Sequence, residues 1–340
     1  MLALAALFGS IEQGVIYAIM ALGVYLTFRI LDFPDLTVDG SFVTGAAIVA
    51  TMITFGYSPI VATLLAIIVG FFAGTITGVL HTKGKINPLL SGIIMMIALY
   101  SINLRIMGLS TETSVTRPNI PLLNEETVFS SFLAFWKTLP VDGWINGMFS
   151  ALGAQSLPGS YGILALMIIV IIVIKLIVDF FLQTEIGLAI RATGNNQRMI
   201  RSFSANTDRL IILGLGISNG LVALAGGLIA QYNKFADNGM GVGMIIVGLA
   251  SVIIGEAIFG TKTIVRTTFA VIIGSVIYRI ILGFALRINL DPGDMKLITA
   301  IIVVIALVVP RLFEERRNKK KKLQRRAALD AERGDLLVKN

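Results

Sequence analysis

The sequence consists of repeated apolar stretches, most about 20 residues long, each bounded by polar or charged residues. A helix that crosses a hydrocarbon core about 30 Å thick needs about 20 apolar residues. The sequence does not show the alternating segments of about ten residues that build outer-membrane barrels, so the spans are expected to be helical. This pattern predicts an all-α polytopic membrane protein with about nine transmembrane helices. The expected spans are 10–28, 40–55, 58–80, 88–108, 160–182, 209–231, 240–261, 266–286 and 295–310.

The composition agrees with a chain that lies mostly in lipid. Hydrophobic residues make up 56% of the 340 residues and charged residues 14%, and the mean hydropathy is +0.86. Soluble domains carry about 25% charged residues. The sequence has no cysteine, and its one histidine, His81, lies beside Lys83 and Lys85. A disulfide is therefore excluded and a metal site lacks ligands, so we expect no metal and no cofactor.

The distribution of lysine and arginine predicts how the spans are oriented. Short cytoplasmic loops of membrane proteins carry an excess of these residues. On an alternating path, the basic loops at Lys83, 183–208 and Lys262 fall on the same side as the tail 311–340. We therefore expect this side to be cytoplasmic, with the carboxyl end inside. The N-terminus and the segment 109–159 are expected to lie outside.

The net charge of +8 comes largely from the tail 311–340, which contains the sequence RRNKKKKLQRR. Basic runs beside a membrane span bind anionic lipid headgroups. No soluble module accompanies the charge, so we expect contact with membrane lipid and no binding of nucleic acid.

One string resembles a nucleotide-binding motif. GEAIFGTKT at 255–263 is similar to a phosphate-binding G-x-x-x-x-G-K-T loop but has one residue too many before Lys262. The backbone cradle requires the lysine directly after the second glycine, and a strand before the loop. Paired carboxylates, a usable histidine and a nucleophile elbow are also missing from the sequence. We therefore expect no catalytic residues and no enzyme activity in this chain.

A few polar side chains fall inside or beside the apolar spans. An ionisable side chain at the centre of a span costs about 2.5 to 3.5 kcal/mol on insertion scales, so it needs an explanation. Arg279, about two turns from the outer end of its span, could snorkel or face a pathway. Asparagines either bond a neighbouring helix or line a pathway. The candidates for a substrate pathway are Asn87, Asn103, Asn219 and Arg279.

A polar stretch, GLAIRATGNNQRMIRSFSAN at 187–206, interrupts the apolar pattern for about one loop's length. It carries Arg191, Arg198 and Arg201 and no acidic residue. A cationic, weakly helical segment between two spans can dock on a soluble partner, because arginines form charge-assisted bonds with carboxylates. The alternative is a solvated loop that only follows the bias of basic residues toward the cytoplasm.

This stretch and a second segment carry a resemblance to a known family. The run G-x-x-x-R-A-x-G-x-N at 187–196 and the small-residue helix at 220–227 resemble permease subunits of ATP-binding-cassette (ABC) importers. That family serves branched-chain amino acids, ribose and related solutes. Residues 35–41 resemble the family's D-L-S-V-G-S segment, with Asp39 inserted before the glycine. The resemblance covers about residues 10–310.

The resemblance implies a type II ABC importer permease in the bacterial plasma (inner) membrane, with a transmembrane permease domain at 1–310. It also implies a second permease chain in a homodimer, a cytoplasmic ATP-binding subunit in two copies, and an extracytoplasmic solute-binding protein. In the family, the loop that corresponds to 183–208 forms a short coupling helix in a cleft of the ATPase. A turn is expected at Gly194. The coupling residues are Gly187, Arg191, Ala192, Thr193, Gly194, Asn195, Asn196, Arg198 and Arg201.

The external segment 109–159 suits a docking surface for the binding protein. Its residues Phe132, Phe135 and Trp136 could equally form an aromatic interfacial helix.

The overall character resembles the branch of the family that transports aromatic or hydrophobic amino acids, so we expect an amino acid substrate. The alternatives are a sugar or nucleoside importer of the same class, an ion- or proton-coupled secondary transporter, and a membrane scaffold without transport. A proton relay needs several acidic residues at matching depth, and the spans lack them.

Overall fold

The computed structural model of the chain describes residues 4–109, 118–151, 159–203 and 205–285. The chain divides into two units, Met1–Leu290 and Asp291–Asn340. All the helices and strands with assigned bounds belong to the first unit. In the second unit the structure describes six helical positions: Leu297, Ala300, Ile301, Val304, Ile305 and Val308.

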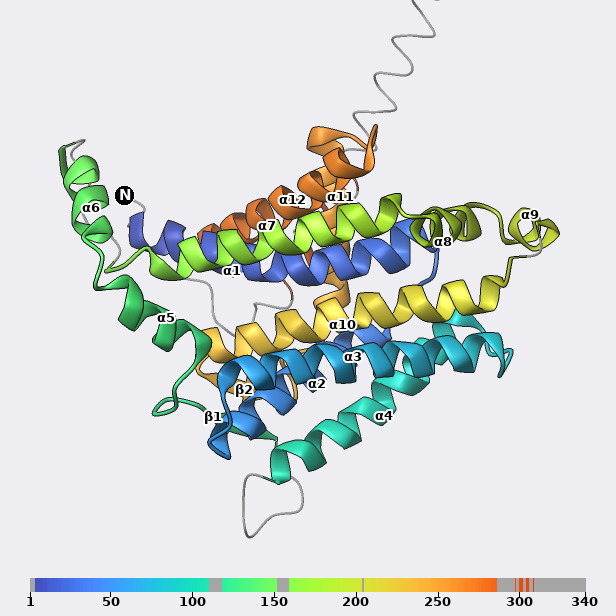
Figure 1. The fold of residues 1–340 in the computed structure, drawn as a ribbon, viewed down its shortest axis with the longest axis horizontal. Helices are drawn as coiled ribbons and strands as arrows, with labels where there is room; N and C mark the ends of the chain where they lie inside the picture. The colour runs from blue at the N-terminus through green and yellow to red at the C-terminus, as the bar shows by residue number, and fades with distance from the viewer. Residues whose placement is uncertain are drawn as a thin grey trace, which may run out of the picture. The chain divides into compact units, whose positions relative to one another are not determined.

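Figure 1 shows a helical protein with two very short strands. A π-helix, η1, directly continues the first α-helix. The elements are α1 (Leu4–Val24), η1 (Tyr25–Ile30), α2 (Thr37–Thr54), α3 (Pro59–Thr82), α4 (Pro88–Gly108), β1 (Asn119–Pro121), α5 (Val128–Trp136), α6 (Val141–Ala151), α7 (Gly162–Gln183), α8 (Glu185–Asn195), α9 (Gln197–Ser202), α10 (Thr207–Asn233), β2 (Phe235–Asp237), α11 (Met244–Phe259) and α12 (Ile264–Ala285).

Seven of the described helices are long and apolar enough to cross a membrane. One is α1 together with η1, and the others are α2, α3, α4, α7, α10 and α12. They confirm the all-α polytopic class, but the count of nine spans is not confirmed. The expected span at 240–261 is shorter, because turns occupy the residues before Met244 and α11 has only 16 residues. The expected span at 295–310 lies largely outside the described residues.

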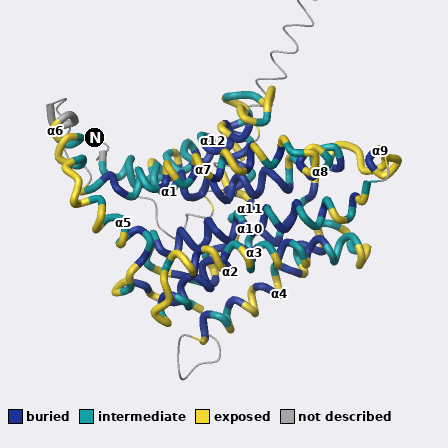
Figure 2. The backbone as a smooth tube through the Cα atoms, in the orientation of Figure 1, coloured by how far each residue is buried: buried dark blue, intermediate teal, exposed yellow. Residues whose placement is uncertain are grey.

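The bundle is built around α10, which packs against α3, α2 and α1. On another side, α1 packs against α12, and α12 packs against α11. Figure 2 shows α2 and α10 buried over most of their length, whereas α3, α4 and α7 keep an exposed outer face. This face is apolar, with side chains such as Leu64, Ile97 and Ile172. An extended apolar surface suits lipid or another apolar chain rather than water.

Glycine lets α10 approach α2 closely. A Cβ atom on Gly226 would lie 1.8 Å from the carbonyl oxygen of Phe42. A Cβ atom on Gly45 would lie 1.9 Å from the carbonyl oxygen of Ala223. Any side chain at either position would collide with backbone, and small residues serve this purpose in packed membrane helices.

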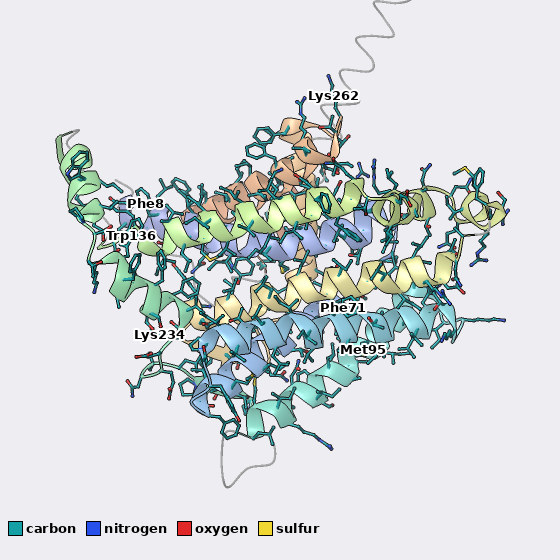
Figure 3. The ribbon with its side chains drawn as sticks, in the orientation of Figure 1. Phe8, Phe71, Met95, Trp136, Lys234 and Lys262 are labelled. Atoms are coloured by element: carbon teal, nitrogen blue, oxygen red, sulfur yellow. The ribbon has the colours of Figure 1, made fainter. Side chains whose placement is uncertain are left out.

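The described part of the segment 109–159 is folded rather than a simple loop. Strand β1 pairs antiparallel with β2, with Ile120 opposite Ala236. Trp136 at the end of α5 (Figure 3) donates its Nε1–H to Asp142 Oδ1 at 2.8 Å. The backbone N–H of Tyr161 donates to the same oxygen at 3.1 Å. Burial raises the pKa of Asp142, but the hydrogen bonds, including those from Trp136 and Tyr161, outweigh burial and leave the pKa below its usual value.

Candidate functional site

The polar stretch of the sequence forms two short helices, α8 and α9, each with a side-chain cap. The hydroxyl of Thr184 accepts a hydrogen bond from the N–H of Gly187 at 3.2 Å and begins α8. Asn196 Oδ1 accepts a hydrogen bond from the N–H of Met199 at 3.1 Å and begins α9. Such caps satisfy N–H groups that a helix end leaves unpaired. The stretch is therefore a defined helical element.

Gly194 lies inside α8 and touches the end of the first span. The expected turn at this glycine is wrong, because α8 continues to Asn195 and Gly194 does not have a positive φ. A Cβ atom on Gly194 would lie 2.0 Å from the carbonyl oxygen of Ile30. Close backbone approach, rather than a special backbone conformation, explains why this position is glycine.

An apolar cluster holds α8 against the spans. Ile190 of α8 packs with Leu31 and Phe33, which follow η1, and with Ile211 and Leu215 of α10. All five side chains are buried. Because packed interiors transmit displacements, a movement of α8 would displace both η1 and α10.

The three arginines of the stretch differ in their partners. Arg201 donates to the hydroxyl of Thr207 at 2.9 Å and pairs with Asp208 at 3.3 Å. Arg198 is exposed and forms no ion pair with any described residue. Arg191 lines a cavity of about 640 Å³ between the end of η1 and α8. A partner carboxylate would therefore meet Arg191 and Arg198 first, since Arg201 is engaged within its own chain.

The other coupling candidates divide between this cavity and the interior. Ala192 and Asn195 line the cavity together with Gly194. Thr193 is buried, and its hydroxyl donates to a carbonyl oxygen of the preceding helical turn at 2.7 Å. Gly187 is also buried, at the point where α8 begins beside the end of α7.

An ion pair near α8 joins η1 to α11. Arg29 Nε lies 2.9 Å from Glu256 Oε1, with side chains 58% and 13% exposed. The two residues are 227 positions apart, so no local pattern in the sequence pairs them. The pair ties η1, on which α8 packs, to α11.

Asn219 belongs to a buried network between α10 and the start of α2. Its Nδ2 donates to Asp35 Oδ2 at 2.7 Å, and its Oδ1 accepts from the hydroxyl of Ser41 at 2.7 Å. Asp35 also accepts from the N–H of Thr37 at 2.9 Å. All four side chains are buried. The network connects the segment 35–41 to α10, and a pathway role for Asn219 stays a prediction.

The other three pathway candidates lie on separate elements. Asn87 is exposed and caps α4 through a hydrogen bond of 3.0 Å. The Arg279 guanidinium lies 3.7 Å from the ring centroid of Tyr17, in a cation–π contact. Asn103 is buried and donates to a carbonyl oxygen of α2 at 3.3 Å. The structure thus brings only Asn103 and Asn219 to the same region, the first turns of α2.

Asp39, the residue inserted in the family motif, caps α11. Its Oδ2 accepts from the N–H of Gly243 at 2.9 Å and its Oδ1 from the N–H of Ile245 at 2.8 Å. A carboxylate at a helix N-terminus satisfies unpaired N–H groups and suits the helix dipole. Sequence reasoning missed this role because the donors lie more than 200 residues further along the chain. The only local signal was the glycine at 243 directly before an apolar run.

The comparison with known families agrees with this architecture. The family model described as the permease component of the branched-chain amino acid transport system matches residues 6–308. The chain belongs to this family. The expected identity as an ABC importer permease is therefore confirmed. The permease is a multi-pass membrane protein, and permeases of this class work with an ATPase and a binding protein.

Several relatives share most of the permease. The tyrosine transport system permease protein of Clostridioides difficile (strain R20291) is 44% identical over 292 residues, which are 86% of this chain and 87% of that protein. An autoinducer 2 import system permease protein of Salmonella typhimurium is 25% identical over 252 residues, 74% of this chain and 62% of that protein. The ribose import permease protein of Escherichia coli (strain K12) is 23% identical over 281 residues, 82% of this chain and 75% of that protein. No solved structure matches the permease.

Proposed function

We propose that the permease forms the membrane pathway of an importer for an amino acid with an aromatic or hydrophobic side chain. The observation that carries this proposal is the 44% identity to a tyrosine transport permease over most of both chains. The sugar and autoinducer permeases are only 23% to 25% identical. In this proposal a binding protein delivers the solute, and two copies of a separate ATPase supply the energy.

Uptake of radiolabelled tyrosine tests the substrate and the energy source together. We expect vesicles that contain the permease, its ATPase and its binding protein to take up tyrosine only when ATP is present on the side of the membrane that carries the ATPase. A protonophore should leave this uptake unchanged, and excess ribose should not compete. Uptake that follows an ion gradient without ATP would instead identify a secondary transporter, and competition by ribose or a nucleoside would identify the alternative importer.

The helices α8 and α9 are proposed to couple the permease to the ATPase. Three features support this role: the caps that make the stretch helical, the exposed Arg198, which has no ion pair among the described residues, and the apolar contact of Ile190 with the residues after η1 and with α10. Partner carboxylates in a cleft would bind Arg191 and Arg198 by charge-assisted bonds. The packed contacts beneath α8 would then carry the motion of the ATPase to the spans.

Single cysteines test the proposed orientation in a bacterial inner membrane, with α8, α9 and the carboxyl end in the cytoplasm. The chain has no native cysteine, so the background is clean. We expect Ser202→Cys and Asn318→Cys to react with a membrane-impermeant maleimide only when the reagent has access to the cytoplasmic side of the membrane. Ser131→Cys in α5 should react only from outside. Labelling of Ser202→Cys from outside would overturn the coupling role of α8 and α9.

The helices α5 and α6, in the segment expected to lie outside the cell, are proposed to receive the binding protein. An exposed apolar face of the bundle is proposed to pair with a second permease chain in a homodimer. Beside α5 lies a cavity of about 820 Å³ whose lining includes Glu125, Glu126, Phe132 and Phe135. Acidic side chains beside aromatic ones suit a basic and partly apolar partner surface.

A further inference from the structure

A third cavity lies between α2, α4 and the turns that precede α11. Its volume is about 410 Å³, which falls in the usual range for small-molecule sites. Val43, Met96, Ile97 and Val242 form an apolar part of its wall. Helix α4 also packs against α3, through Met95 (Figure 3) and neighbouring side chains. One face of α4 therefore lies in the bundle and another face lines the cavity.

This cavity lies near the middle of the membrane-spanning bundle. Ser41 bonds Asn219, which is close to the centre of the spanning helix α10, and Asp39 is two residues before Ser41. Asp39 holds the N-terminus of α11, so the turns at 238–243 lie at the same depth. Non-helical backbone inside a membrane is tolerated where it is buried in protein or lines a cavity. Interrupted helices at mid-depth are a common setting for transported solutes.

Two asparagines at this cavity have unused hydrogen-bond acceptors. Asn103 donates its Nδ2 to the Gly40 carbonyl oxygen at 3.3 Å, and Asn238 donates its Nδ2 to the Tyr100 carbonyl oxygen at 3.4 Å. Their Oδ1 atoms are buried and accept no hydrogen bond from any described residue. Buried polar atoms normally have partners, so each exception needs an explanation. Both Nδ2 bonds are longer than usual, which leaves the amides free to turn toward a ligand.

The charged and polar side chains that line the cavity favour a ligand that donates hydrogen bonds. Asp39 is the one charged side chain among the described lining residues, and a carboxylate offers about four acceptor positions, more than the backbone N–H groups at the start of α11 occupy. A carboxylate and two free amide oxygens match a primary ammonium group. The apolar wall matches an aliphatic or aromatic body. A carboxylate on the same ligand finds no lysine or arginine in the described lining, so it would face the opening of the cavity.

We propose that this cavity binds the ammonium end of the transported amino acid, with Asn103, Asn238 and Asp39 as its acceptors. The site deepens the proposed transport function and rests on it for the identity of the solute. The opening lies beside Ile97 and Val242, whose side chains are 60% and 61% exposed. Ile97 belongs to the exposed apolar face of the bundle, so a second permease chain, rather than lipid, would have to cover this opening for a zwitterionic solute to enter.

The first test uses thiol reagents and needs no transport. A single cysteine at Ser101, which lines the cavity, is reacted with 2-aminoethyl methanethiosulfonate and with its 2-sulfonatoethyl analogue, in the purified permease–ATPase complex. The ratio of the two rates is compared with that of a cysteine at the exposed Asn233. We expect the ratio to favour the ammonium reagent about ten-fold more at 101 than at 233. Adding Asn103→Leu and Asn238→Leu should lower the ratio at 101 toward that at 233, whereas the charge of Asp39 should keep part of the preference.

The second test measures tyrosine uptake in vesicles with the ATPase and binding protein. Asn103→Leu and Asn238→Leu should each lower uptake about ten-fold, whereas Asn233→Leu should not. Equal reagent ratios at positions 101 and 233, or a ratio unaffected by the leucine variants, would overturn the site. Absence of tyrosine uptake in the unaltered complex would overturn the proposed substrate, while the reagent ratios would still decide the site.

Discussion

Replacing Gly194 by valine is expected to abolish coupled uptake. A Cβ atom at this position would lie 2.0 Å from the Ile30 carbonyl oxygen, so α8 must move away from the end of the first span. Overpacking of this kind costs about 1 to 3 kcal/mol, and here displacement of the helix relieves it. The contact of Ile190 with Leu31 and Phe33 is then lost. We expect the variant to insert and to keep its ATPase, but to hydrolyse ATP without tyrosine uptake.

The measurement is ATP hydrolysis and tyrosine uptake in the same reconstituted vesicles. Gly143→Val is a matched control, because a Cβ atom on Gly143 in α6 meets no atom within 4 Å. That control should behave like the unaltered permease. Gly194→Ala should show the same uncoupling in weaker form, since it adds one carbon to the same contact. Normal coupling in Gly194→Val would mean that the contact between α8 and Ile30 carries no motion.

Asn219→Leu is expected to cause the largest loss of stability among single substitutions of the polar network. The change removes both the donor to Asp35 Oδ2 and the acceptor for the Ser41 hydroxyl, each at 2.7 Å in a buried setting. A buried polar group left without its partner costs about 1 to 3 kcal/mol, and a charged group costs more. The free energy of unfolding should fall by several kcal/mol. The unfolding midpoint of the purified permease should fall with it.

The matched control for this substitution is Asn233→Leu on the same helix. Asn233 is exposed at the end of α10, so its change should leave the unfolding midpoint almost unchanged. An unfolding midpoint of Asn219→Leu equal to that of the control would show that the network contributes little to stability. Asn219 would then be left with its predicted role in the pathway.

The spans and the family could be predicted from the sequence because both depend on local order. A run of about 20 apolar residues specifies a membrane helix whatever its neighbours are. The motifs at 187–196 and 220–227 are contiguous, so they indicate the family without knowledge of packing. The length expected for the span at 240–261 was wrong because hydropathy is also a local property. Hydropathy does not distinguish the turns before Met244 from the helix that follows them.

The sequence by itself determined that this protein is a helical membrane permease with a helical polar stretch between two spans. Tertiary structure alone decided which distant residues meet. Asp39 caps α11, Arg29 pairs with Glu256, and Gly194 contacts Ile30, each across a long separation in the chain. The physical reason is that helix formation follows from neighbours along the chain, whereas close approach and hydrogen bonding between helices depend on how whole helices pack.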